Sequence, residues 1–536
     1  MSDNFTQAIQ KFKELLGSDA VITEQTIRNN YETATYQTDN KVLAIVKPAS
    51  REQVQQCLRI ANEFHLPLYP VSTGLNVGYG SKVPSANNCI ILELKRMNNI
   101  VDFNAELAHI TIEPGVTQAQ LYQFLQADKS NLWMDATGSF THHSLIGNIA
   151  ERGFGHTPYG DHFAQVGGME VVLANGNCIH TGFGRFPNAK ARGVYKWGVG
   201  PYIDGLFTQS NFGIITQITL WLMPAPEYSQ TFYFSVKKHE QLAEVVNLLR
   251  PLRLNGTINS AMHIANDYKV LQSIGSYPWD KTEHKTPLSK AHLKELSKTW
   301  DFGAWNASGA LYGSKAQVAL ARKLIKKQLK GKVKKLRFID DRLLKFAEAI
   351  QKPYQWLTGI NLSEMLKIIK PVVGLTKGVP TNAMIPSTYW RKTRHNAKET
   401  TRKNTPEQDA CGLMWLSPVA PTDGQYALEI WSMVEAVFSK YQFEPAVSIT
   451  LITERTMDCV VALSYDREIE GEDRRAQQCH DELFKQLTDA GYYPYRLGIH
   501  SMQGLPEPEA DYQQFIASIK QAIDANGILS PGHYDS

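Results

Sequence analysis

The hydrophobic pattern of the first 230 residues alternates between short strands and helices. The run VLAIV at 42–46 is typical of a buried strand, and Ser50 with Gln53 forms a capping box that begins the next helix. Along that helix, apolar residues recur at the spacing of one buried face: Val54, Cys57, Leu58 and Ala61. Further apolar runs predict strands at 66–71, 89–94 and 109–114. The pattern predicts an α/β domain.

The pattern changes after WLMPAPE at 221–227, where two prolines close a strand. Beyond it, helices mix with apolar strands such as TFYFSV, AVSITLI and CVVALSY, so we expect a second, α+β domain up to about residue 490. Long polar connections are expected around 280–300 and 390–410. A final helix is expected to end at Asn526 and Gly527.

Charge is nearly balanced over the 536 residues: 56 Lys and Arg stand against 52 Asp and Glu, a net charge of +4. One basic stretch, KLIKKQLKGKVKKLR at 323–337, places Leu324, Ile325 and Leu329 on one side at helical spacing. We interpret it as a solvated helix leading into a strand, in preference to a nucleic-acid or membrane patch. The sequence therefore predicts no nucleic-acid partner.

No apolar run has the length of a membrane-spanning helix, and the first residues lack the layout of a secretion signal, so no membrane association is expected. The six cysteines show neither CxxC pairs nor regular spacing, which predicts no metal site and no disulfide framework. A reducing, cytoplasmic location is the expectation.

The loop STGLNVGYGSK at 72–82 contains Gly74, Gly78 and Gly80 and is followed by a strand. A Walker loop needs Gly-Lys-Ser/Thr before a helix, and a dinucleotide fingerprint needs GxGxxG before a helix, so neither fits. What remains is a loop whose backbone amides point into one concavity and hold an anion such as a pyrophosphate. The alternative is a glycine-rich turn between strands.

Several segments, in order along the chain, resemble the vanillyl-alcohol oxidase and 4-cresol dehydrogenase family of flavoproteins. They cover most of residues 42–227 and the C-terminus, and include STGLNVGYG, IGNIAERGFGHTPYGDHF, GPYIDGLF and ANGILSPG. The resemblance implies an α+β fold with a two-subdomain FAD-binding domain at 1–227. It also implies an α+β cap (substrate) domain at 228–490 and a return of residues 491–536 to the FAD-binding domain.

The resemblance implies FAD as the cofactor and assigns residues to it in three places. The glycine loop would hold the pyrophosphate through amides near Ser72, Thr73, Gly74, Leu75, Asn76 and Gly78. A second turn would contact the flavin through Gly147, Asn148, Glu151 and Gly153. Backbone groups of Gly213 and Ile215 would complete the site.

The family grips a phenol oxygen with two tyrosines and an arginine, which Tyr79, Tyr495 and Arg496 match in this sequence. Two hydroxyl donors and a fixed cation lower the pKa of a bound phenol, because each stabilises the anion. Asp161 in TPYGDH matches the family's aspartate beside flavin N5, where it would act as a base toward water. Taken singly, Tyr79, Tyr495 and Arg496 could have structural roles, and Asp161 could form an Asx turn.

Two departures from the family pattern affect the chemistry. Aligned on the strand that carries the family's histidine tether, this chain has Asp458 and Cys459, and no motif places Tyr389, Tyr426 or Tyr441 as a tether. We therefore expect FAD to be held without a covalent bond, with a Cys459 thioether as the alternative. Separately, His142 and His143 stand before the flavin turn, where either could serve as a base, bind an acidic group, or lie exposed in the loop.

Three functions follow, of which the first is preferred. The chain would be an FAD-dependent oxidase or dehydrogenase that takes a hydride from the benzylic carbon of a para-substituted phenol, giving a quinone methide. Alternatively, it would oxidise a non-phenolic alcohol, hydroxy acid or biosynthetic intermediate, or be a catalytically silent flavin-binding scaffold. The expected partner is a small, aromatic substrate, and the resemblance suggests a homodimer.

Overall fold

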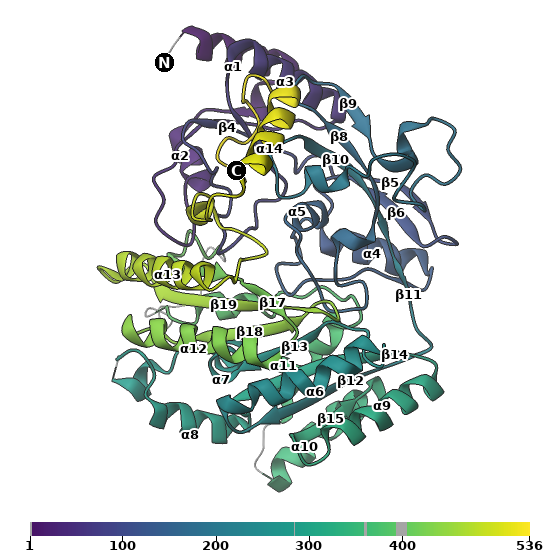
Figure 1. Cartoon of the computed structure of the whole chain (residues 1–536), viewed down its shortest axis with the longest axis vertical. Coiled ribbons are helices and arrows are strands. Elements are labelled where there is room, and N and C mark those ends of the chain that lie inside the picture. Colours follow the sequence, from purple (N-terminus) through teal and green to yellow (C-terminus); the bar gives the residue numbers. More distant parts are fainter. Residues whose placement is uncertain (1–2, 284, 359–361, 393–404, 536) are drawn as a thin grey trace.

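The chain folds into two parts, the expected FAD-binding part and the expected cap, which lie one above the other in Figure 1. This computed structural model describes residues 3–283, 285–358, 362–392 and 405–535. The predicted fold class, an α+β fold with a two-subdomain unit and an α+β cap, is confirmed. The chain enters the cap sheet at Tyr228 and leaves the last cap helix at Asp489, close to the predicted domain boundaries.

The first subdomain is a four-stranded sheet covered by helices. Its strand order is β1 (Val21–Ile22), β2 (Val42–Val46), β4 (Cys89–Glu93) and β3 (Leu68–Val71), and the last three run parallel. Ser50 caps α3 (Arg51–Phe64) by accepting from the Gln53 amide, and the predicted stripe is buried. The remaining helices of this subdomain are α1 (Asp3–Leu16), which is amphipathic, and α2 (Gln25–Arg28).

The second subdomain is a five-stranded antiparallel sheet. Its strand order is β5 (Ile100–Asn104), β6 (His109–Ile112), β10 (Ile214–Trp221), β8 (Val166–Val172) and β9 (Cys178–His180). Beside it lie α4 (Gln118–Asp128), α5 (Leu145–Ala150) and the ribbon of β7 (Leu132–Trp133) with β11 (Met223–Pro224). The sequence predicted alternation of strands and helices but not this change from parallel to antiparallel pairing.

The cap is built on an eight-stranded sheet. Seven strands follow the order β15 (Lys334–Ile339), β12 (Tyr228–Val236), β14 (Trp305–Gly313), β13 (Met262–Asn266), β18 (Ala446–Leu451), β19 (Thr456–Asp466) and β16 (Cys411–Leu416). The short β17 (Val419–Pro421) also pairs with β19. The cap helices are α6 (Leu242–Leu254), α7 (Asp267–Ile274), α8 (Lys290–Trp300), α9 (Lys315–Leu329), α10 (Asp341–Thr358), α11 (Leu362–Leu375), α12 (Gly424–Lys440) and α13 (Glu472–Asp489).

The two faces of the cap sheet have different partners, because side chains alternate along each strand. Ile264, Ile449, Cys459 and Val461 join the hydrophobic core under α6, α9, α12 and α13. Their strand neighbours, including His263, Thr450 and Val460, line a cavity on the opposite face. The strand register therefore decides which residues reach the site.

The C-terminal tail packs on the FAD-binding part, where α14 (Ala510–Ile523) appears in yellow in Figure 1. After α14, Leu68 donates its amide to Ile528 and accepts from the Ser530 amide, so the tail follows the edge of β3. Asp524 accepts from the amides of Ile528 and Leu529 and fixes this turn. The helix ends at Ile523, three residues before the predicted stop.

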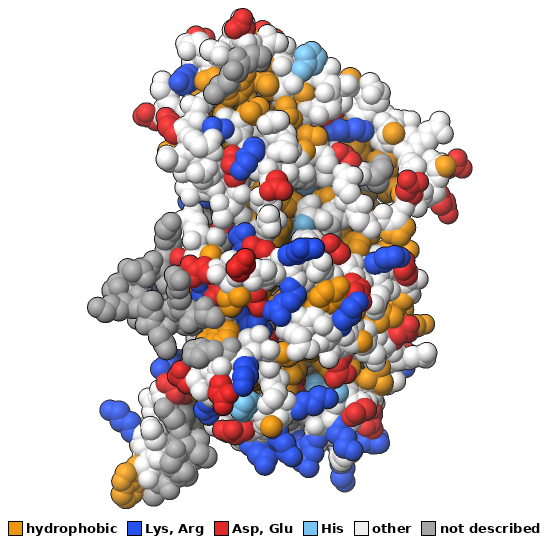
Figure 2. Space-filling model, turned by 90° about the vertical axis from the view of Figure 1, so that its left-hand side faces the viewer, with side chains coloured by type: hydrophobic (Ala, Val, Ile, Leu, Met, Phe, Trp, Pro, Cys, Tyr) orange, Lys and Arg blue, Asp and Glu red, His pale blue; other side chains and the backbone are white. Residues whose placement is uncertain are grey.

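Some predictions for the cap are wrong in detail. Residues 290–300 form α8 instead of a polar connection, and residues 393–404 of the other expected connection lie outside the described residues. The basic stretch is a helix followed by a strand as predicted, but Leu324 is exposed. Figure 2 shows lysine and arginine side chains gathered at the lower end of the molecule, on the cap.

Two predicted absences can be compared with the described residues. In the described ranges no helix combines the length and the apolar character that crossing a bilayer requires. All six cysteines are free thiols, and within the same ranges no group of three or more His, Cys, Asp or Glu side chains is arranged to hold a metal ion.

Candidate active site

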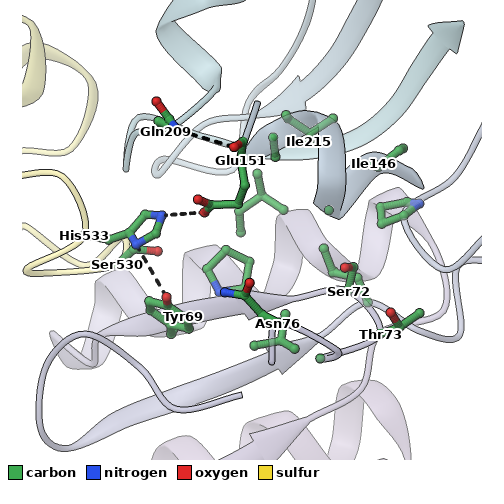
Figure 3. Close-up of a pocket in the computed structure, with 18 of the residues that line it drawn as sticks. Tyr69, Ser72, Thr73, Asn76, Ile146, Glu151, Gln209, Ile215, Ser530 and His533 are labelled. Carbon is green, nitrogen blue, oxygen red and sulfur yellow. Dashed lines mark hydrogen bonds and ion pairs between the residues drawn. The ribbon is translucent and has the colours of Figure 1, made fainter. Parts of the chain in front are cut away.

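A deep cleft lies between the two subdomains of the FAD-binding part (Figure 3). One wall is the loop after β3, and another is α5 with the residue that follows it, through Ile146, Gly147, Ala150 and Glu151. The segment leading into β10 and the C-terminal tail close the cleft. Nine residues predicted to hold the cofactor line it: Ser72, Thr73, Gly74, Leu75, Asn76, Gly147, Glu151, Gly213 and Ile215.

The cleft has the properties that a dinucleotide cofactor requires. Within the described residues, the backbone amides of residues 72–77 have no protein acceptor, although residues 72–76 line the cleft. Successive free amides in a concave loop bind anions such as a pyrophosphate. A Cβ on Gly147 would collide with the Ser72 hydroxyl, and one on Gly213 would collide with Val171. Glycine at these positions therefore lets the backbone pack closely against its neighbours beside the cleft. The cleft therefore fits FAD.

A buried charge network crosses the wall of the cleft. Arg496 pairs with Glu151 through Nε and Oε2 at 3.3 Å, and its guanidinium also donates to Asn76 Oδ1 at 2.6 Å. His533 of the tail pairs with Glu151 Oε1 at 3.2 Å and approaches the Tyr69 hydroxyl at 3.4 Å, as Figure 3 shows. Burial alone would raise the pKa of Glu151, but Arg496 and His533 outweigh it and lower that pKa to about 2.

A second cavity lies between the FAD-binding part and the open face of the cap sheet. It shares four lining residues with the cofactor cleft: Leu75, Asn76, His143 and Arg496. Much of its lining is apolar, including Phe154, Leu375 and Trp415. An apolar cavity that touches a cofactor cleft is the usual form of a substrate pocket.

The three residues predicted to hold a phenol all line this second cavity. The Arg496 guanidinium lies 4.3 Å over the Tyr79 ring, and the Tyr79 hydroxyl is 3.0 Å from Ser417 Oγ. Burial raises the pKa of both Tyr79 and Tyr495, and each also feels the charge of Arg496. Both tyrosines are therefore neutral hydrogen-bond donors at neutral pH, beside a fixed cation.

Asp458 is a fourth titratable group near this trio. Its side chain is on the cavity face of β19, it is 5% exposed, and no hydrogen-bond partner is found for it among the described residues. Burial, helped by the nearby Asp161 carboxylate, raises the pKa of Asp458 to about 7. An acid with such a pKa can both accept and release a proton near neutral pH. The sequence contained a signal for it, a charged residue near the start of the largely apolar strand that begins at Thr456.

Several predicted site residues lie outside both cavities. Asp161 is exposed and its carboxylate accepts from the Ala164 amide at 3.1 Å, which is the turn role considered as its alternative. His142 is exposed, whereas His143 lines both cavities. Gly78 lies under Trp415, with its amide bonded to Thr35, so it makes room for an indole and lies away from the cofactor cleft.

Asn148 and Gly153 line the second cavity instead of the cofactor cleft. Asn148 Oδ1 lies 2.6 Å from His162 Nδ1, within hydrogen-bond distance. The other ring nitrogen, His162 Nε2, lies 2.6 Å from Asp135 Oδ2. A Cβ on Gly153 would overlap the Asn148 side chain. These residues therefore organise the turn between the two cavities.

A thioether to Cys459 is contradicted by the strand register. The Cys459 side chain is fully buried in the cap core, on the face opposite to the cavity. Tyr389 donates to Asp409, Tyr426 is exposed on α12 and Tyr441 donates to Glu482. None of these three tyrosines lines the cofactor cleft.

Sequence patterns did not single out several residues of the second cavity. His156, His263 and Lys269 line it, and His533 lines the cofactor cleft. His263 and Lys269 come from β13 and α7, which reach the cavity only because β13 pairs between β14 and β18. No local signal in the sequence specifies that pairing.

Comparison with known proteins agrees with this geometry. Residues 42–182 match the family described as FAD binding domain. A protein of Chondromyces crocatus, 1'-carboxy-chondrochloren decarboxylase, is 42% identical over 99% of this chain and 97% of its own length. The 4-cresol dehydrogenase (hydroxylating) flavoprotein subunit of Pseudomonas putida is 32% identical, over 98% of this chain and 95% of its own.

Two solved structures superpose on the whole chain. That of p-cresol methylhydroxylase with substrate bound has a TM-score of 0.88 and 30% identity, and it covers 100% of this chain and 97% of its own. That of 4-ethylphenol oxidase from Gulosibacter chungangensis, in complex with isoeugenol, has a TM-score of 0.89 and 27% identity with the same coverage. The chain therefore belongs to the vanillyl-alcohol oxidase and 4-cresol dehydrogenase family of FAD-linked oxidases, and it is an FAD-dependent oxidoreductase.

Proposed function

We propose that this enzyme oxidises the benzylic carbon of a para-substituted phenol, which it binds as the phenolate. The observation that supports this most is the convergence of Tyr79, Tyr495 and Arg496 on a cavity that shares a wall with the cofactor cleft. Two neutral hydroxyl donors and a guanidinium stabilise a phenolate more than a phenol, so they lower the pKa of the bound ligand.

Bound FAD would accept the hydride in this reaction. The residues of the chain would prepare the substrate for that transfer. Tyr79 and Tyr495 donate to the phenolate oxygen, and Arg496 neutralises its charge. Asp458 takes up the proton that the phenol releases. Electron density then moves toward the para position, which helps the benzylic hydrogen to leave as a hydride with the electron pair of the C–H bond. The substrate that remains is a quinone methide.

The fate of the quinone methide gives two candidate reactions. Water can add to the benzylic carbon and give an alcohol. If the next carbon carries a carboxylate, the bond to that carboxylate can break instead; its electron pair forms a C=C bond to the benzylic carbon, the ring regains its phenolate and CO2 leaves. The relative from Chondromyces crocatus, which its name describes as a decarboxylase, supports the second reaction as an alternative.

The direct test is anaerobic titration of the purified holoenzyme with a panel of 4-alkylphenols. We expect the visible flavin band to bleach, and the product to be an alcohol, an alkene or an alkene with CO2. Bleaching only by non-phenolic donors would favour the non-phenolic alternative. Yellow colour that passes a filter after denaturation would support our proposal that the FAD is not covalently bound.

Two further proposals concern the state of the protein. We propose a homodimer, supported by the family, which gel filtration with light scattering would check. We also propose a cytoplasmic location, supported by the six free thiols, which cell fractionation would check.

Replacing Asp458 with Asn is expected to remove a pH dependence from flavin reduction. In the unmodified enzyme the reduction rate should rise as pH passes 7, because ionised Asp458 can accept the phenol proton. The D458N variant should be about 100-fold slower above pH 8 and show no inflection near 7. Anaerobic stopped-flow reduction by a 4-alkylphenol from pH 6 to 9 measures both.

Cys459→Ala is the matched control, since its side chain lies on the opposite face of the same strand. It should keep the inflection near pH 7, even if it lowers the melting temperature. An inflection that survives in D458N would show that another group accepts the proton.

A further inference from the structure

The titratable side chains that line the second cavity, apart from its tyrosines, are all basic. They are His143, His156, His263, Lys269 and Arg496. Among the described residues no Asp or Glu lines the cavity, and Asp458, although on the same face of β19 as Val460, is not one of the lining residues. A neutral 4-alkylphenol uses only the phenol-binding end, with Tyr79, Tyr495 and Arg496. The remaining bases have no role in that reaction and need an explanation.

Lys269 is an unpaired cation in this cavity. Its ammonium lies 4.8 Å over the Trp415 ring, and no carboxylate is found within ion-pair distance among the described residues. Arg496 differs, because it has a carboxylate partner, Glu151, at 3.3 Å. Burial lowers the pKa of Lys269 to about 8, so the group is still mostly protonated at neutral pH. An anion beside it would recover the free energy lost by desolvation.

The position of Lys269 is fixed by the end of β13. Asn266 caps α7 by accepting from the Lys269 amide at 2.9 Å. The same Asn266 donates to the Pro445 carbonyl at 2.6 Å and accepts from the Val447 amide at 3.0 Å, which ties the helix to β18. Lys269 therefore projects from a fixed helix start, and only its side chain can adjust to a ligand.

Two histidines that line the same cavity have hydrogen-bonding atoms without a protein partner among the described residues. The rings of His156 and His263 lie 4.3 Å apart, and His263 Nδ1 is bonded to Thr450 at 3.1 Å. The other atoms, His156 Nδ1 and His263 Nε2, are buried with no partner among the described residues. Unsatisfied buried polar atoms are rare in folded proteins and indicate a missing hydrogen-bond partner. A ligand with several acceptor oxygens would satisfy them.

Given the proposed phenol oxidation, we infer that the substrate carries a carboxylate on its para side chain, bound by Lys269 with hydrogen bonds from His156 and His263. This inference rests on the proposed function, because the phenol end orients the side chain toward the cap. It deepens that function by naming an anionic substrate class. Neutral alkylphenols would leave Lys269 and the two imidazoles unpaired.

The experiment compares two probes that cannot be oxidised, because an ether oxygen replaces the benzylic carbon: 4-hydroxyphenoxyacetate and its neutral match 4-ethoxyphenol. Their dissociation constants are measured with holoenzyme by calorimetry and by perturbation of the flavin spectrum. We expect the carboxylate to bind at least tenfold more tightly. Lys269→Gln should lose about tenfold or more of the affinity for 4-hydroxyphenoxyacetate and less than threefold for 4-ethoxyphenol.

Lys298→Gln, an exposed lysine of α8, removes the same charge from the surface and should change neither value. Lys269→Arg should restore part of the preference, which separates charge recognition from a general packing effect. Equal affinity of the unmodified enzyme for both probes, or an unchanged preference in K269Q, would overturn the inference. If 4-alkylphenols still bleach the flavin in that case, the proposed function stands; if neither probe binds, both fail.

Discussion

Replacing Arg496 with Met is expected to slow flavin reduction by a 4-alkylphenol about 1000-fold. The guanidinium is the one cation at the phenol end of the cavity among the described lining residues, and it lies 4.3 Å over the Tyr79 ring. Without it the two tyrosines still donate hydrogen bonds, but the phenolate charge is left in a buried site without a counter-ion. The bound phenol then stays protonated and does not release electrons toward its para carbon.

The same variant gives a reading that does not depend on turnover. 4-Nitrophenol has no benzylic hydrogen, and its absorption distinguishes phenol from phenolate. The unmodified holoenzyme should bind it as the phenolate at a pH where it is largely protonated in water, whereas R496M should bind it as the phenol or not at all. Difference spectra across pH give the pKa of the bound ligand directly.

Arg152→Met is the matched control for this prediction. Arg152 follows Glu151 in the chain, but it is exposed and lines neither cavity. Its Nε donates a hydrogen bond to the Thr208 hydroxyl. It should leave both the reduction rate and the pKa of bound 4-nitrophenol unchanged. If R496M still ionises the bound phenol, the cation is not the source of activation and the tyrosines alone would have to supply it.

How much of this site the sequence could predict depends on how local each feature is. The capping box at Ser50 and the buried stripe of α3 involve residues within one helix, so periodicity predicts them. The amides of the glycine loop also lie within a few residues of one another. Residues 72–76 line the cofactor cleft, but Gly78, two positions later, serves the indole of Trp415, which comes from the cap.

Features that depend on long-range pairing could not be predicted. An alternating strand shows that one face is buried, but not what covers either face. The sequence therefore did not show which of the neighbours Asp458 and Cys459 faces the cavity and which faces the core. Pairing of Thr450 with both His263 and Asp458 turns the latter two toward the same face of the sheet. Similarly, the sequence could not predict the ion pairs of Glu151, because its partners Arg496 and His533 come from the last 41 residues of the chain.

Replacing Glu151 with Gln should lower the free energy of unfolding at pH 7 by about 3 kcal/mol. Its carboxylate carries three contacts: Arg496 at 3.3 Å, His533 at 3.2 Å and the Tyr534 hydroxyl at 3.3 Å. Removing one partner of a buried ion pair leaves the other charge unpaired, which is more costly than removing both. A pKa lowered from 4.5 to about 2 corresponds to the same order of magnitude, about 3 kcal/mol.

The pH dependence of the difference identifies the cause. Because the folded-state pKa is lowered, the unfolded chain binds the extra proton first, so this stabilisation is complete above pH 4.5 and is lost as pH falls toward 2. The difference in the free energy of unfolding between the two proteins, measured by urea unfolding, should therefore decrease from pH 5 to pH 3. Glu283→Gln, which removes an exposed partner of Lys285, should show almost no gap at any pH. If the difference in the free energy of unfolding stayed constant across this range, E151Q would be less stable because of lost packing. The charge of Glu151 beside Arg496 would then not be what holds the tail against the cofactor cleft.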